Sequence, residues 1–308
     1  MSDKPACSII IPSYRSTKTI GACLTALVAQ DYAGPYEIIV VDSSPDETPE
    51  LVRRMFPAVR LIHLPQQTDP AQARNIGAEH ASGDVLAFID SDCTAGSRWL
   101  SQLAATIEEG YDGVGGATSN ANGDTLVSWA GYMCEFREFL PEGKPHDVWN
   151  LSLNNVAYRR DSFYAAGCFP VGYFPQEDQV FHATMRELKL RLCFDPGIVV
   201  AHMHRTERTA FLHHQRCIGR ANAQVLREID LAGTPLARNR WLALLALPAL
   251  VPFRFTRTIL ACWKVEFALV FRRPTLAWLC WLGMCWWGLG FLEGANGRRS
   301  WSIIRKGH

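Results

Sequence analysis

Several features that would identify a functional class are missing from this sequence of 308 residues. Its 31 basic and 30 acidic residues leave a formal net charge of +1, so neither a basic nucleic-acid-binding face nor an acidic tail is predicted. The ten cysteines form no C-x-x-C pair or other metal-type spacing, which favours reduced core cysteines over disulfides. The first residues, MSDKPACSIIIPSY, lack the pattern of a signal peptide. We therefore expect a main domain in the cytosol and no nucleic-acid partner.

Long apolar runs are also missing as far as Trp241, and from there leucine, tryptophan, phenylalanine and alanine dominate. The run 274–292 has no charged residue and is close to the minimum length of a membrane-spanning helix. We predict an α/β domain at 1–225 and a membrane-associated helical region at 226–308. Because basic residues stand on both sides of the run, a spanning helix and helices lying in the cytosolic interface are both open.

Short apolar segments rich in β-branched residues alternate with segments of helical periodicity in the first part of the chain. The predicted strands are 7–11, 37–42, 59–64 and 84–90, and the predicted helices between them are 16–30, 46–56 and 70–81, with Ser16, Asp46 and Asp69 as N-caps. This order predicts an α/β fold with a parallel sheet. Ligands of such sheets bind beyond the carboxyl ends of the strands, where Ser13, Asp42 and Asp90 stand.

The second part of the chain is less regular. We predict a strand with a glycine-rich turn at 112–120, a helix at 125–139, a strand at 150–160, a helix at 177–189 and a hairpin-like segment at 191–204. The helix at 177–189 begins with acidic residues, which the partial positive charge of a helix N-terminus stabilises.

The segment FIDSD, at residues 88–92, ends an apolar strand in two carboxylates separated by one serine. Two like charges this close repel each other unless a cation lies between them. Mg²⁺ and Mn²⁺ take a few carboxylates from a protein and fill their coordination shells with phosphate oxygens. Although D-x-D is common in solvated turns, its place at the end of a buried strand predicts that Asp90 and Asp92 hold a divalent cation on a diphosphate.

Six segments, in this order, resemble the signature of family 2 glycosyltransferases: IIIPSY, EIIVVDSS, AQARNIGAEHASGDVLAFIDSD, NNVAYRR, QEDQVF and VVAHMH. The resemblance covers about residues 6–222. It implies a GT-A fold, in which a Rossmann-like mixed sheet binds a nucleotide-diphosphate sugar with Mn²⁺ or Mg²⁺ as cofactor. The donor would then be a UDP-, GDP- or dTDP-sugar.

The resemblance also implies roles for single residues in donor binding. Pro12, Tyr14 and Asp42 would hold the nucleotide, and Arg74 would face its diphosphate. The Tyr14 ring can lie against a base, and Asp42 can accept hydrogen bonds from a base or a ribose hydroxyl. Simpler interpretations stay open, because Asp42 can cap a turn and Arg74 can be an ordinary helical arginine.

The metal site is implied in the same way. His202 would complete it beside Asp90 and Asp92, and Asp90 and Ser91 would also contact the donor. Imidazole suits Mn²⁺ better than Mg²⁺. The alternative is a zinc cluster built from neighbouring histidines, which are His204, His213 and His214.

Asp178, in the pair Glu177-Asp178, resembles the family's general base, which takes a proton from the acceptor hydroxyl. A carboxylate at a helix N-terminus is held ionised and oriented, and simple helix capping is the alternative. The sequence lacks the Q-x-x-R-W motif of relatives that make long polymers, and its nearest match is 215–219. A non-processive enzyme is therefore expected.

We predict an inverting, metal-dependent glycosyltransferase that moves one sugar to a hydroxyl of a lipid-linked or membrane-embedded glycan acceptor, in cell-surface glycan or glycolipid synthesis. Its C-terminal region would anchor it to the cytoplasmic face of the cell membrane. Two alternatives stay open. One is transfer to polyprenyl monophosphate, whose oxygen is already ionised and needs no base, and the other is a membrane protein that binds nucleotide sugars without catalysis.

Overall fold

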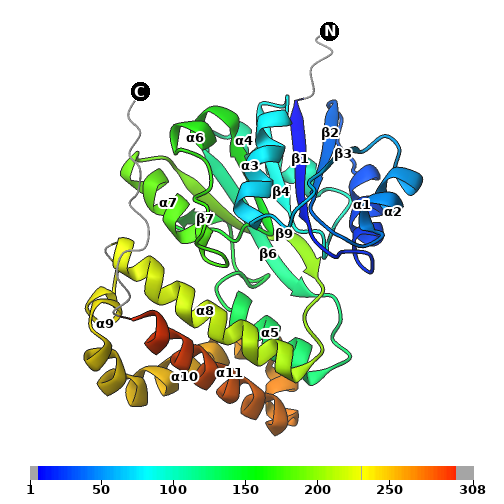
Figure 1. Cartoon of the computed structure of the whole chain (residues 1–308). Coiled ribbons are helices and arrows are strands. Elements are labelled where there is room, and N and C mark those ends of the chain that lie inside the picture. The colour runs from blue at the N-terminus through cyan, green and yellow to red at the C-terminus, as the bar shows by residue number, and fades with distance from the viewer. Residues whose placement is uncertain (1–5, 230, 296–308) are drawn as a thin grey trace.

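The computed structural model describes residues 6–229 and 231–295 and, within them, the side chains outside 264–272. These residues form a mixed β-sheet covered by helices on both faces, with a second group of helices gathered at one end of the sheet (Figure 1). The predicted α/β fold is confirmed.

The sheet of the described chain has nine strands. They are β1 (Cys7–Ser13), β2 (Tyr36–Asp42), β3 (Arg60–His63), β4 (Val85–Ile89), β5 (Cys93–Ala95), β6 (Gly113–Asn120), β7 (His146–Val148), β8 (Asn155–Arg159) and β9 (Leu192–His202). Their order is β3-β2-β1-β4-β8-β6-β9-β5, with β7 paired to β9. The first four strands pair in parallel, as predicted, because each is a continuous apolar run that can be buried on both faces. At β8 the direction reverses.

Three helices connect the parallel strands, and they are α1 (Ile20–Val28), α2 (Thr48–Met55) and α3 (Pro70–His80). Asp69 caps α3, since its carboxylate accepts a hydrogen bond from the N–H of Ala71 at 2.9 Å. Asp46 lies just before α2 and accepts from the N–H of Thr48 at 3.0 Å. The N-cap predicted at Ser16 is wrong, because α1 begins only after Thr19 and has no side-chain cap.

The hairpin predicted at 191–204 is also wrong. The segment is one strand, β9, which runs parallel to β6 and shifts register between Gly116 and Ala117. Pro196 and Gly197 suggested a turn, but they lie where the register shifts, in a bulge that keeps the strand continuous. A Cβ at Gly116 would lie 1.9 Å from the carbonyl oxygen of Ile198, so only glycine allows the two strands to approach here.

The remaining helices cover the sheet and extend beyond it. They are α4 (Trp99–Glu108), α5 (Leu126–Phe136), α6 (Arg160–Ala165), α7 (Glu177–Glu187), α8 (Arg208–Glu228), α9 (Thr234–Arg238), α10 (Arg240–Arg272) and α11 (Pro274–Gly294). Helices α5 and α8 to α11 form the group at the end of the sheet (Figure 1). The domain boundary predicted at 225 and 226 falls inside α8, and the division into two domains stays a prediction.

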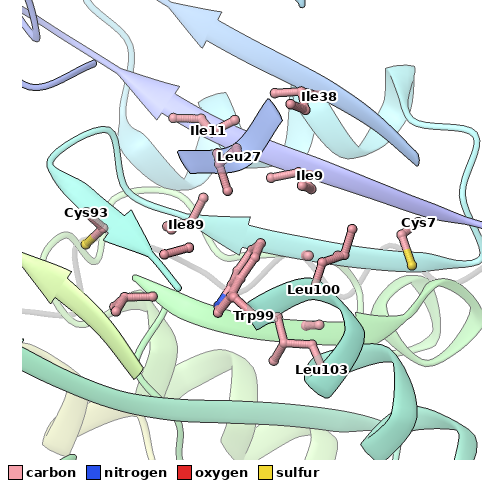
Figure 2. Close-up of a cluster of buried hydrophobic side chains, with 14 of the residues drawn as sticks. Cys7, Ile9, Ile11, Leu27, Ile38, Ile89, Cys93, Trp99, Leu100 and Leu103 are labelled. Atoms are coloured by element: carbon pink, nitrogen blue, oxygen red, sulfur yellow. The ribbon is translucent and has the colours of Figure 1, made fainter. Parts of the chain in front are cut away.

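One face of the sheet buries its core under α1 and α4. The ring of Trp99, from α4, is fully buried close to Ile89 of β4 and Leu27 of α1 (Figure 2). Its indole N–H donates to the Oδ1 atom of Asn155 at 2.8 Å, so the polar atom of this large side chain is satisfied. The packing fixes the ends of β4 and β8, from which polar side chains continue.

Two helices, α10 over Arg240–Trp263 and α11, are long and apolar enough to cross a membrane, by length and composition only. Both windows have a mean hydropathy of 1.4, yet 11% of the α10 window is buried against 50% of the α11 window. Helix α11 packs tightly on α8, because a Cβ at Gly219 would lie 1.9 Å from the carbonyl oxygen of Trp287, and one at Gly290 would lie 1.9 Å from that of Arg216. The basic residues expected beyond 295 lie outside the described residues.

Candidate functional site

A cavity of about 710 Å³ opens where the carboxyl end of β4 faces the start of α7 and the C-terminal helices. Five of the predicted catalytic, donor-binding and metal-binding residues line it, and they are Arg74, Asp90, Asp92, Asp178 and His202. They come from four segments far apart in the chain. The fold therefore brings together the residues predicted for the diphosphate, the metal and the base.

Arg74 joins two acidic segments at the floor of this cavity. Its side chain is 5% exposed, and its two terminal nitrogens donate to Asp90 Oδ1 at 2.6 Å and to Glu177 Oε1 at 2.9 Å. Burial alone would lower the pKa of Arg74, but the two carboxylates raise it above its ordinary value, so the guanidinium stays charged. Arg74 thus fixes the end of β4 against the start of α7, and its contact with a diphosphate stays a prediction.

Asp92 and His202 meet across the sheet edge. The distance from Asp92 Oδ1 to His202 Nε2 is 3.4 Å. The other ring nitrogen of His202, Nδ1, lies 3.3 Å from Nε2 of His204, which fixes the orientation of the His202 ring. Burial raises the pKa of Asp92, His202 lowers it and Asp90 raises it again, with a net rise. A cation beside these two residues would restore the charged carboxylate.

The donor atoms at this point fit a divalent cation. The ligand atoms of Asp92, Cys93 and His202 all lie within 4.8 Å of one another, and Asp90 is two residues away. Carboxylate oxygen with imidazole nitrogen suits Mn²⁺ and, less well, Mg²⁺. Burial, Asp92 and Asp90 raise the pKa of the Cys93 thiol well above its ordinary value, so this sulfur is the weakest ligand of the three.

The zinc alternative finds less support. Among the described residues, the single group of three or more potential ligands that converges is the one at Asp92. His204 touches it only through the His202 ring, and burial lowers the pKa of His204 to about 2. His214 instead lies 3.7 Å from Glu135.

Asp178 is the second residue of α7, and its side chain lines the cavity. Its Oδ1 atom is buried without a hydrogen-bond partner, and its Oδ2 atom accepts from Nδ2 of Asn150 at 3.3 Å. Burial and the neighbouring Glu177 raise the pKa of Asp178 to about 7, although the Asn150 contact and the helix N-terminus lower it. A carboxyl group with this pKa can take up and release a proton near neutral pH.

A buried chain of polar side chains stands behind Asp178. Oδ1 of Asn150 lies 2.8 Å from Nδ1 of His182, and Nε2 of His182 lies 2.7 Å from the hydroxyl of Tyr158. Burial lowers the pKa of His182 to about 3, so the ring is neutral. This chain orients Asn150 and through it the carboxylate of Asp178. Sequence reasoning missed it, since His182 is 24 residues from Tyr158 and nothing in the local pattern marks the three residues as partners.

The predicted nucleotide-binding residues lie at the ends of β1 and β2, outside the lining of the cavity. Tyr14 is 36% exposed, and the guanidinium of Arg15 lies 5.5 Å from the centre of its ring. Asp42 is fully buried, and its carboxylate accepts hydrogen bonds from Ser13 Oγ at 2.6 Å and from Ser44 N–H at 2.9 Å. In this arrangement Asp42 organises the loop ends of both strands.

Pro12 and Ser91 complete the predicted set. Pro12 pairs with Val41 in the parallel β1 and β2 ladder. The hydroxyl of Ser91 lies 2.7 Å from that of Ser16, which joins the loop after β4 to the loop after β1. The structure thus joins Ser91 to the loop that carries Tyr14, and the roles of all these residues stay predictions.

The sequence pattern of Glycosyl transferase family 2 matches residues 8–168, more than half of the chain. The chain belongs to this family. A curated relative, glycosyltransferase AglE of Haloferax volcanii, is 39% identical over 121 residues, which are 37% of this chain and 40% of the relative. The chain thus spans less than half of the length of this relative.

Solved structures confirm the GT-A fold of the chain. A mannosyltransferase from Pyrobaculum calidifontis, in complex with GDP-Man and Mn²⁺, superposes with a TM-score of 0.62 at 17% identity, over 94% of this chain and 88% of that one. TarS 1-349 of S. aureus, in complex with UDP-GlcNAc, superposes with a TM-score of 0.55 at 20% identity, over 92% and 90% of the two chains.

Proposed function

We propose that this chain is an inverting, non-processive glycosyltransferase that uses a divalent cation and moves one sugar from a nucleotide-diphosphate sugar to a hydroxyl group. The observation that carries the proposal is Asp178, a carboxyl group with a pKa of about 7 in the same cavity as Asp90, Asp92 and His202. A base and a set of metal ligands facing one space are what a single displacement at a sugar carbon requires.

In the proposed reaction, Asp178 removes the proton of the acceptor hydroxyl as its oxygen attacks C1 of the donor sugar. The bond from C1 to the diphosphate oxygen breaks on the opposite side, so the configuration at C1 inverts and nucleoside diphosphate leaves. Asp90, Asp92 and His202 would hold Mn²⁺ or Mg²⁺, which offsets the negative charge of the departing diphosphate. Arg74 keeps the two acidic segments at a fixed separation.

The donor class is supported by the fold relatives, whose structures contain GDP-Man with Mn²⁺ or UDP-GlcNAc. The acceptor is proposed to be a lipid-linked or membrane-embedded glycan. The C-terminal helices support this, since Trp287 and Phe291 of α11 and Leu250 of α10 line the same cavity as Asp178. An acceptor with an apolar part can therefore lie along them.

Membrane attachment at the cytoplasmic face is part of the proposal. Helix α10 exposes large apolar side chains that the described protein does not cover, among them Trp241 at 76% and Leu245 at 78% exposure. Exposed apolar faces of this size mark membrane or protein contacts.

The test is a screen of UDP-, GDP- and dTDP-sugars with membrane lipids and Mn²⁺, in which the release of nucleoside diphosphate is measured. We expect release with one donor class and a loss of about a hundredfold or more in Asp178→Asn. Near-normal turnover of Asp178→Asn would favour polyprenyl monophosphate as acceptor. Donor binding without any transfer or hydrolysis would favour the non-catalytic binding protein.

A further inference from the structure

Three arginines gather at the end of the cavity formed by the C-terminal helices. Arg137 follows α5 directly, and Arg254 and Arg257 lie on α10. All three line the cavity, together with Glu138. We refer to these three arginines as the arginine cluster.

The arginine cluster holds more positive charge than its neighbours neutralise. Arg137 lies 3.3 Å and Arg257 lies 3.1 Å from the same oxygen, Oε1 of Glu138. Among the described residues, no carboxylate lies within 4.0 Å of Arg254, whose guanidinium sits 3.8 Å from the centre of the Trp287 ring. Three positive charges and one negative charge leave the site with a net charge of +2.

Burial makes the positive charge of two of these arginines, Arg137 and Arg254, costly. The side chain of Arg137 is 9% exposed, and the Nε atoms of Arg137 and Arg254 are buried without a hydrogen-bond partner. A buried charge that lacks a partner destabilises the fold unless a counterion joins it. Arginine forks bind phosphate oxygens in pairs, so a phosphate group would satisfy both the charge and the free donors.

The residues around the arginine cluster indicate which chemical groups, besides a phosphate, a ligand of this cavity would carry. Trp287, Phe291 and Leu250 line the cavity beside the arginines, and Asp178 lines the same cavity with Asp90 and Asp92, which follow β4. A molecule with a phosphate at the arginines can lay an apolar chain along α10 and α11 and extend a sugar toward Asp178.

We propose that the arginine cluster binds the phosphate or diphosphate of an acceptor that carries an apolar chain. This inference rests on the proposed function, because it names the chemical class of the acceptor for that reaction. In the proposed function the donor diphosphate lies at the cation held by Asp90 and Asp92, so the acidic residues and the arginine cluster would each serve one phosphorylated substrate. The phosphate at the arginines positions the acceptor hydroxyl and takes no part in bond breaking.

The test uses the full chain in detergent micelles and three probes: farnesyl diphosphate, farnesol and inorganic pyrophosphate. We expect farnesyl diphosphate to bind at least about tenfold more tightly than either of the other two. Arg254→Gln and Arg257→Gln should each weaken its binding about tenfold or more, because each removes a charge-assisted contact. Arg53→Gln, at an exposed surface pair with Glu50, is the matched control and should bind like the wild type.

Two results would overturn the inference: equal binding of farnesyl diphosphate to the wild type and to both arginine variants, or pyrophosphate binding as tight as that of farnesyl diphosphate. Arg257 is 56% exposed, so its variant stays informative even where Arg254→Gln fails to fold. Nucleotide-sugar binding with Mn²⁺ is measured in parallel. Normal donor binding without farnesyl diphosphate binding refutes only this inference, whereas absence of donor binding refutes the proposed function.

Discussion

The cavity has an acidic end, at Asp90 and Glu177, and a basic end, at the arginine cluster. The two ends differ in how far neighbouring residues neutralise their charges. At the acidic end, Arg74 bonds to both Asp90 and Glu177, so the protein itself supplies the counter-charges. At the basic end, Glu138 is the shared partner of two arginines, and among the described side chains Arg254 lies against the Trp287 ring and pairs with no carboxylate. The first arrangement is organised in advance for chemistry, and the second is organised for a charge that arrives with a ligand.

The largest effect should come from the acidic end. The double variant Asp90→Ala, Asp92→Ala should lower turnover about a thousandfold or more with every acceptor, because the charge on the leaving diphosphate is no longer offset. Release of nucleoside diphosphate measures it, and chelation of Mn²⁺ should have the same effect on the wild type. Asp147→Asn is the control, since that carboxylate is exposed on β7. Unchanged turnover in the double variant would contradict the assignment of this end.

The next effect concerns the pH dependence of the base. Asp178 must be ionised to accept a proton, so kcat/KM should rise as pH increases through about 7 and be lost below it. Asn150→Ala removes a hydrogen bond that favours the carboxylate, so the acid limb should move up by about one pH unit.

If Asn150 had only a structural role, Asn150→Ala would lower kcat/KM without shifting the acid limb of its pH profile. Donor KM should stay the same in Asn150→Ala, because Asn150 faces the base and not the predicted nucleotide residues.

A smaller effect is expected at the crossing of α8 and α11. Gly290→Ala places a Cβ 1.9 Å from the carbonyl oxygen of Arg216, so α11 must move away from α8 at a cost of about 1–3 kcal/mol. Gly21→Ala in α1 is the matched control, since a Cβ there meets nothing within 4 Å and should stabilise the helix slightly. Unfolding by urea measures both, and equal midpoints would contradict the tight crossing.

The smallest effect on turnover is expected at the outer face of α10. Trp241→Glu with Leu245→Glu should lower binding to lipid vesicles about tenfold, while release of nucleoside diphosphate in detergent stays normal. Met55→Glu changes an apolar residue of α2 that is 57% exposed and should leave vesicle binding unchanged. Vesicle binding that survives the α10 changes would show that this face is not the membrane contact.

The sequence predicted the parallel half of the sheet because its strands are continuous apolar runs separated by capped helices. It failed at β9, where Pro196 and Gly197 look like a turn and only the neighbouring β6 shows that they form a bulge. It predicted the cluster of Arg74, Asp90, Asp92, Asp178 and His202 in one cavity through motif order. The partners of these residues depend on tertiary contacts that no local pattern records.

The two apolar helices, α10 and α11, also show that composition alone does not predict tertiary contacts. Their windows have the same mean hydropathy, and the run favoured from the sequence as the membrane segment, in α11, is the more buried of the two. Hydropathy measures how apolar a helix is and does not say whether protein or lipid covers it. The glycines of α11 decide the outcome, since they allow α8 to approach its backbone.

The neutral ring of His182 limits where Asp178 could pass on the proton that it takes up in the proposed reaction. With a pKa of about 3, this ring does not take on a proton near neutrality, so no exit route leads inward from Asp178 through Asn150. In the proposed reaction, the proton taken from the acceptor would therefore leave Asp178 toward the cavity that this residue lines.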